Sequence, residues 1–294
     1  MDYKQILSEF TEKLNKYYSF HLMFLGAFLL EFTLLVLLLP FLARSGIVAL
    51  TLAALMVTLF GYLSIKSYRQ TVFFEEIKHL IDRYGSQVVL EKSPNAPLDI
   101  KKGEVANAYL EFADILPIKA TINLPYLPNF LEDLFLKYLD VGPQTLKEGL
   151  IKRSIQNRIE SLKLNPVICE KHSDLSSAYL SLATFYKSLS KKKDERESLQ
   201  KSAESLKILS DLNPQDTYPL ERLAFIYKEL NDIEGEIAIL ERWLKLDPKK
   251  SEPMLRVGQL YFNSGKSALG FKTYETLKSL DLKQSDELLK SFQF

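Results

Sequence analysis

The chain has 294 residues, and its 38 Lys and Arg nearly balance its 37 Asp and Glu, which gives a formal net charge of +1. This balance excludes the concentrated positive charge with which nucleic-acid-binding proteins attract phosphates, so we expect no nucleic-acid partner. Cys169 is the single cysteine, which excludes an intramolecular disulfide and a metal site built from several thiolates.

Residues 1–19 form the first predicted element. Their apolar side chains recur at helical spacing and predict one stripe of an amphipathic N-terminal helix: Tyr3, Ile6, Leu7, Phe10, Leu14 and Tyr17. Such a helix either lies at a membrane interface or runs directly into the next element.

Two long apolar segments follow, at residues 20–41 and 47–65, separated only by a short stretch around "LARSG". Each has about the 20 apolar residues that a helix needs to cross a bilayer. We therefore predict a transmembrane helical hairpin over residues 20–65. A cleaved signal peptide is disfavoured because the apolar core is too long and no cleavage motif follows it. A buried hairpin of a soluble protein is the other alternative.

Positive charge flanks the hairpin mainly on the side of the chain termini: Lys4, Lys13, Lys16, Lys66, Arg69 and Lys78, against Arg44 alone at the tip. By the positive-inside rule, this distribution predicts an integral membrane protein with two spans and both termini in the cytoplasm.

Glu31 lies in the middle of the first apolar segment, where a carboxylate costs about 2.5–3.5 kcal/mol on insertion scales. A tight hairpin pairs residues whose numbers sum to about 89, which places Thr58 at the same depth. One interpretation is a hydrogen bond from Glu31 to Thr58 or to a neighbouring copy, with homo-oligomers forming through the hairpin. The other is a proton or ion path, which usually needs further ionisable partners.

Residues 66–100 are predicted to form a juxtamembrane helix that stops at Gly85, followed by a proline-containing linker. Residues 101–175 are predicted to be helical, and whether they contain a degenerate repeat stays open. One of their helices ends in "LKLNP" at Pro166, a pattern that returns downstream.

The pattern Leu-x-Leu-Asx-Pro or a close variant recurs with a fixed period. Pro214, Pro248 and the equivalent Leu282 are 34 residues apart, and each unit carries a small residue followed three positions later by tyrosine. The small residues are Ala183, Ala224 and Gly258. The chain therefore resembles the tetratricopeptide repeat (TPR) family, in which each repeat is a helix-turn-helix unit.

The resemblance implies an all-α chain, with the two-helix transmembrane hairpin followed by an α-solenoid of about three TPR-like repeats. The three repeats cover residues 176–284, as 176–216, 217–250 and 251–284, and residues 285–294 form a C-terminal cap. We place seven additional residues of the first repeat in its turn, at "SKKKDERE". Glu236 departs from the family pattern because alanine is preferred at its position, and Gly235 is the candidate for the close helix approach.

In the TPR family, the first helices of successive repeats line a concave groove. The register places these side chains in it: Leu180, Thr184, Lys187, Tyr218, Glu221, Phe225, Lys228, Glu252, Leu255, Gln259 and Phe262. Chaperone-binding relatives hold carboxylates with Lys and Asn, whereas Leu180 and Thr184 occupy those places here. The groove therefore favours an apolar or amphipathic segment of a protein partner. Alternatively, other helices of the chain cover part of this strip.

We expect neither enzymatic activity nor a cofactor or metal site. His21, His79 and His172 are scattered along the chain, and Cys169 near His172 has no defined oxyanion element. The predicted function is that of a membrane-anchored TPR scaffold or adaptor that binds a protein partner at the cytoplasmic face. The alternative is a transport or channel component that uses the hairpin with Glu31, the repeats being regulatory. The hairpin topology also resembles that of inclusion-membrane proteins of intracellular bacteria.

Overall fold

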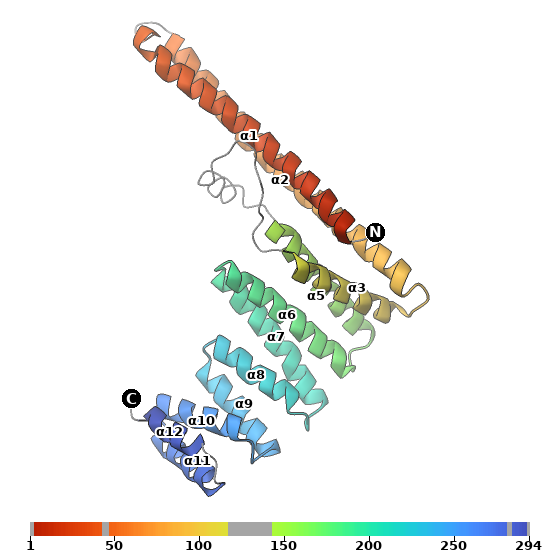
Figure 1. The fold of residues 1–294 in the computed structure, drawn as a ribbon, viewed down its shortest axis with the longest axis vertical. Coiled ribbons are helices and arrows are strands. Elements are labelled where there is room, and N and C mark those ends of the chain that lie inside the picture. The colour runs from red at the N-terminus through yellow and green to blue at the C-terminus, as the bar shows by residue number, and fades with distance from the viewer. Residues whose placement is uncertain (1–2, 43–46, 117–142, 281–283, 293–294) are drawn as a thin grey trace. The chain divides into compact units, whose positions relative to one another are not determined.

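The computed structural model describes residues 3–42, 47–116, 143–280 and 284–292, and every regular element in these ranges is an α-helix (Figure 1). The predicted all-α class is therefore confirmed. The hairpin tip at residues 43–46 and the apolar stretch at 117–142 lie outside the described residues. The chain divides into two compact units, Met1–Asn95 with Glu111–Leu150, and Ala96–Leu110 with Ile151–Phe294.

The first unit contains the long hairpin formed by α1 (Tyr3–Leu42) and α2 (Ile47–Lys92). The predicted helix end at Gly85 is wrong, because α2 continues to Lys92. The sequence after Gly85 keeps helical spacing and buries Val88 at 5% exposure. One glycine inside a helix costs only about 1 kcal/mol, which such burial offsets.

Two contacts at different positions along the described part of the hairpin agree with the predicted register. Thr58 faces Glu31 with 3.2 Å between Oγ1 and Oε1, and Glu76 pairs with Lys13 at 3.1 Å. Both pairs of residue numbers sum to 89, the value expected from a tight turn. The register predicted from the hairpin tip therefore extends far beyond the apolar segments.

The two halves of the hairpin expose different kinds of surface. Near the N-terminus, Phe10 is 1% exposed and meets Phe73 with ring centroids 6.4 Å apart. Towards the tip, Leu30 is 70% exposed and Val57 is 72% exposed. The stretches Lys4–Leu37 and Ala49–Lys92 each contain a segment long and apolar enough to cross a membrane.

Two further helices, α3 (Leu98–Ile115) and α5 (Pro143–Leu164), contribute to both units. In the first unit Gly149 of α5 lies against α2, where a Cβ would come within 2.8 Å of Ile81. In the second unit the hydroxyl of Ser154 donates to the carbonyl of Ala106 at 2.8 Å.

The second unit also contains three helix pairs and a final helix, stacked in chain order (Figure 1). The pairs are α6 (Cys169–Ser188) with α7 (Lys192–Leu212), α8 (Tyr218–Glu229) with α9 (Ile233–Leu246), and α10 (Ser251–Asn263) with α11 (Ser267–Ser279), and the final helix is α12 (Gln284–Phe292).

The recurring Asx-Pro sequence stops the second helices. Asn213 and Asp247, which precede the prolines, have φ of −131° with ψ of 81° and 82°. A residue before proline is forced out of the helical region by the proline ring, so α7 and α9 end at the same place in the repeat. Helix α5 likewise ends at Leu164, two residues before Pro166.

Within each pair, the turn between the helices is a Schellman motif centred on a left-handed residue. Ser190, Asn231 and Gly265 have φ of 58°, 56° and 74°. The following amide donates to the carbonyl of the recurring tyrosine of its repeat: Lys191 to Tyr186, Asp232 to Tyr227 and Lys266 to Tyr261, at 3.0, 2.9 and 2.8 Å. The repeated tyrosine thus marks the end of every first helix.

The additional residues of the first repeat lie in α7, not in the turn. The turn at Ser190 has the same hydrogen bonds as the other two. Pro214 follows Ser190 by 24 residues, whereas Pro248 follows Asn231 by 17. The prediction of an enlarged turn at "SKKKDERE" is therefore wrong. Most of this charged run lies in α7, where the seven residues add about two helical turns.

Glu236 is buried, at 3% exposure, and its carboxylate is held by the guanidinium of Arg256 from the next repeat. The two contacts, Nε to Oε1 at 2.5 Å and Nη2 to Oε2 at 2.9 Å, form a bidentate pair. The close approach inside this repeat falls to Gly235, where a Cβ would come within 2.9 Å of Tyr227.

We predict that Arg256→Ala lowers the free energy of unfolding by about 3–5 kcal/mol, because it leaves a buried carboxylate without a partner. The measurement is urea unfolding of the full chain, followed by circular dichroism. Glu236→Ala with Arg256→Ala should recover part of the loss. The matched control is Lys187→Ala, which breaks the exposed pair with Glu229 and should leave the midpoint unchanged. An equal loss of stability in Arg256→Ala and in Lys187→Ala contradicts the prediction.

Candidate functional site

The predicted groove residues lie on α6, α8 and α10, the first helices of the three pairs. Seven are exposed, namely Thr184, Lys187, Tyr218, Glu221, Phe225, Lys228 and Glu252, and four are partly buried, namely Leu180, Leu255, Gln259 and Phe262. Their role in binding stays a prediction.

Tyr218 and Phe225 are the exposed aromatic side chains of this face, at 42% and 49% exposure. They are seven residues apart on α8, about two turns, and so lie on one side of the helix. The opposite side buries Leu220, Leu223 and Ile226 completely. The hydroxyl of Tyr218 lies 3.3 Å from Ser173 Oγ, which links the aromatic pair to α6.

Leu255 and Phe262 pack inside the third repeat. Both pack against the buried cluster of Met254, Leu277 and Leu288. Phe262 also lies directly over Gly270, where any Cβ would collide with its ring, and meets Phe271 at 5.4 Å between centroids. The accessible aromatic part of the predicted strip is therefore concentrated at α8.

Charged side chains on the first helices already form ion pairs within the protein. Lys187 of α6 pairs with Glu229 of α8, and the hydrogen bond to Glu229 raises the pKa of Lys187. Arg256 of α10 is held by Glu236, so its guanidinium is already paired within the protein.

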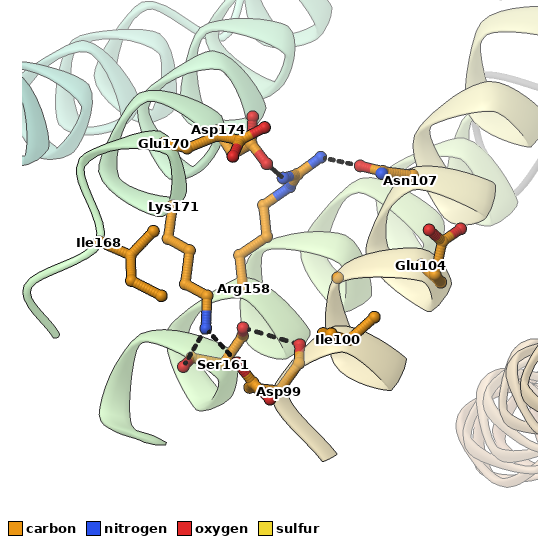
Figure 2. A pocket seen from close by; sticks show the side chains of 11 residues that line it. Asp99, Ile100, Glu104, Asn107, Arg158, Ser161, Ile168, Glu170, Lys171 and Asp174 are labelled. Carbon is orange, nitrogen blue, oxygen red and sulfur yellow. Dashed lines mark hydrogen bonds and ion pairs between the residues drawn. The ribbon is translucent and has the colours of Figure 1, made fainter. Parts of the chain in front are cut away.

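A polar cavity of about 360 Å³ between α3, α5 and α6 was missed by sequence reasoning (Figure 2). Its polar lining residues are Asp99, Glu104, Asn107, Arg158, Ser161, Glu170, Lys171 and Asp174. These come from three separate stretches of sequence, each of which reads as the charged side of a helix. Only the packing of α3 beside α5 and α6 brings them together.

Two ion pairs hold the cavity lining in place. Arg158 Nη1 lies 2.8 Å from Asp174 Oδ2, and Lys171 Nζ lies 2.9 Å from Asp99 Oδ2. Hydrogen bonds from Lys171 and from Asn165 lower the pKa of Asp99 below its usual value. Arg158 also donates to Asn107 Oδ1 at 2.7 Å, so α3, α5 and α6 are joined through one guanidinium.

Glu31 and Thr58 are brought together within the hairpin, as the register predicts. Thr58 Oγ1 lies 3.2 Å from Glu31 Oε1 and also 3.2 Å from the carbonyl of Ala54. Oε2 of Glu31 is buried and makes no hydrogen bond within the described residues. The contact joins the two helices at the depth of their apolar segments.

Cys169 and His172 do not form a nucleophile–base pair. Cys169 begins α6 and packs against the core cluster around Leu199. His172 Nε2 donates to the carbonyl of Pro166 at 2.8 Å. Among the described residues, no three His, Cys, Asp or Glu side chains are grouped so that they could hold a metal ion.

The class that this fold defines is a helical-repeat protein of the TPR type, preceded by a long apolar helical hairpin. The repeated Schellman turns, the Asx-Pro helix ends and the small-residue and tyrosine positions recur in the stacked pairs.

Comparisons with known proteins give resemblances of fold only. No protein-family model matches the chain, and no curated protein matches it. Among solved structures, a crystal structure of MamA is 18% identical, with a TM-score of 0.35, and the match covers 52% of this chain and 91% of that one. TTC0263, a thermophilic TPR protein in Thermus thermophilus, is 17% identical, with a TM-score of 0.36, and the match covers 74% of this chain and 100% of that one. MamA 41-end from Desulfovibrio magneticus RS-1 is 13% identical, with a TM-score of 0.34, and the match covers 70% and 95%.

We predict that two aromatic residues of the groove differ in how much they contribute to the stability of the fold. Phe262→Ala should lower the free energy of unfolding by about 2–3 kcal/mol, because it empties the space between α10 and α11. Phe225→Ala should change it by less than about 0.5 kcal/mol, since this side chain is half exposed. Urea unfolding of the two full-length variants, followed by circular dichroism, measures both effects. A large loss for Phe225→Ala would show that other parts of the chain cover it.

Proposed function

We propose that this protein is a membrane-anchored TPR scaffold or adaptor, whose repeats bind a protein partner at the cytoplasmic face. The observation that carries the binding role is the exposed pair Tyr218 and Phe225 on the first helix of the second repeat. Stacked helical repeats build extended surfaces for partners, and exposed apolar side chains on such a surface mark interaction sites.

The membrane anchor is supported by the exposed apolar half of the hairpin. Leu30, Leu50 and Val57 are each at least 70% exposed, in segments long enough to span a bilayer. In water such a surface is unfavourable by about 25 cal/mol for each Å² of apolar area. A hydrocarbon environment removes that cost. The positive charges flanking the segments favour cytoplasmic termini.

The transport alternative has less support from the surroundings of Glu31. The apolar part of α2, residues 49–65, contains no Asp, Glu, Lys, Arg or His. His21 on the same helix as Glu31 is ten residues away, about 15 Å along the axis. The hydroxyl of Thr58 donates to Glu31 Oε1 and lies equally close to the carbonyl of Ala54, so Glu31 has a hydrogen-bond partner on the facing helix. Glu31 then joins two helices and needs no relay.

We predict that protease added to the cytoplasmic face removes the repeats, while an epitope tag inserted at Ser45 stays protected. Both outcomes follow from two spans with cytoplasmic termini. Immunoblotting of intact and permeabilised membranes measures them. Protection of the repeats in intact membranes would overturn the topology.

We predict that a photo-crosslinking amino acid at position 221 captures a protein partner in the native membrane, and that Phe225→Ala weakens this capture. Glu31→Leu should retain it, because the hairpin does not contact the partner in this proposal. Mass spectrometry of the crosslinked product identifies the partner. If Glu31→Gln abolishes an ion flux and Phe225→Ala changes nothing, the transport alternative replaces the adaptor.

A further inference from the structure

The cavity between α3, α5 and α6 carries an excess of negative charge. Four carboxylates line it, Asp99, Glu104, Glu170 and Asp174, against two cations, Arg158 and Lys171. Both cations are already paired, with Asp174 and Asp99 respectively. The formal charge of the lining is therefore −2, and this excess repels anions and favours a cationic group.

Glu104 and Glu170 are the two carboxylates of the lining that take no part in these ion pairs. Neither makes an ion pair within the described part of the chain. Glu170 lies in the first turn of α6, where an acidic side chain stabilises the helix dipole. Glu104 lies well inside α3 and has no such role. In Figure 2, the two side chains come from facing helices on either side of the cavity.

The cavity adjoins the surface that carries the exposed aromatic pair. Glu170, Ser173 and Asp174 lie within just over one turn of α6, and Ser173 contacts the hydroxyl of Tyr218 at 3.3 Å. The cavity and the aromatic pair of α8 are thus linked through neighbouring residues of α6. We name this surface the inner face, defined by Glu104, Glu170, Ser173, Tyr218 and Phe225.

Charges further along the chain, on α8 and α10, are balanced. Glu221 on α8 and Glu252 on α10 are exposed and make no ion pair among the described residues. Arg222 and Lys228 are the cations nearest to them on α8. Together with Glu104 and Glu170, these groups count four carboxylates against two cations. The excess of negative charge is therefore that of the cavity, while Tyr218 and Phe225 supply the exposed aromatic area.

We propose that the partner of the inner face is a basic amphipathic helix. Its apolar side contacts Tyr218 and Phe225, and one of its Lys or Arg side chains enters the cavity between Glu104 and Glu170. The proposal rests on the adaptor function proposed above and adds the chemistry of the partner. Lys and Arg suit this cavity because their long apolar stems reach past Ile100 and Ile168 while their charge meets the two carboxylates.

The test uses the full chain in an uncharged detergent and a fluorescent Leu/Lys amphipathic peptide of about 18 residues, or five turns. The second probe is the same peptide with every Lys replaced by Glu. Fluorescence anisotropy, corrected with empty micelles, measures binding at low and high salt. We expect the basic peptide to bind and the acidic peptide to bind at least about tenfold more weakly, with the difference shrinking as salt is raised.

Two double variants locate the contact. Glu104→Gln with Glu170→Gln should weaken the basic peptide about three- to tenfold at low salt, the effect of removing two exposed charge pairs. The matched control is Glu204→Gln with Glu275→Gln, which changes the charge equally on the second helices and should leave binding unchanged. Circular dichroism checks that each variant is folded. If the first pair unfolds, Glu104→Gln alone gives the same comparison.

The outcomes separate this proposal from the adaptor function. If Phe225→Ala weakens the peptide but neither Glu104→Gln nor Glu170→Gln does, the basic side chain does not enter the cavity and only this inference falls. Equal binding of the basic and acidic peptides also overturns it. If Phe225→Ala has no effect on the peptide or on the partner crosslinked at position 221, the inner face is not the binding surface and the proposed function falls too.

Discussion

The position of each repeat depends on where the helix before it stops. A proline after Asn213 or Asp247 forces that residue out of the helical region, and the next first helix begins within four or five residues, at Tyr218 or Ser251. At the other end of each pair, the tyrosine carbonyl accepts the Schellman hydrogen bond that closes the turn. These two backbone stops fix the crossing of the helices. The exposed side of α8 is a consequence, because Leu220, Leu223 and Ile226 must face the core that the stops create.

Features that depend on local or periodic sequence were predictable. The 34-residue spacing, the Asx-Pro helix ends and the hairpin register through Glu31 and Thr58 each follow from the order of residues along one stretch of chain. The extension of α2 past Gly85 could not be predicted in this way, because a glycine stops a helix only when no burial offsets its cost. The cavity was unpredictable for a different reason. Asp99, Arg158 and Lys171 are far apart in sequence, and each has the spacing of an ordinary solvated helix charge.

The departures from the TPR pattern show how packing replaces a preferred residue. Alanine is preferred where Glu236 stands, and the close approach that alanine would provide falls to Gly235 beside Tyr227. The buried carboxylate is then compensated across the repeat boundary by Arg256. This choice has a cost in desolvation, since an ion pair in the interior is no more stable than a well-packed apolar contact. It also removes Arg256 from the groove, so one departure alters both stability and the charge offered to a partner.

The hairpin has two kinds of surface along one pair of helices. Beyond its apolar segment, at residue 65, α2 continues for 27 residues to Lys92, about 40 Å at 1.5 Å per residue. Over this length α1 supplies Ile6, Phe10 and Leu14 to a buried seam, and ion pairs such as Arg83 with Glu9 cross its edge. Towards the tip the seam gives way to exposed apolar side chains and to the polar contact of Glu31 with Thr58. Because the helices do not break where this change occurs, the proposed anchor and the buried seam belong to one continuous pair of helices.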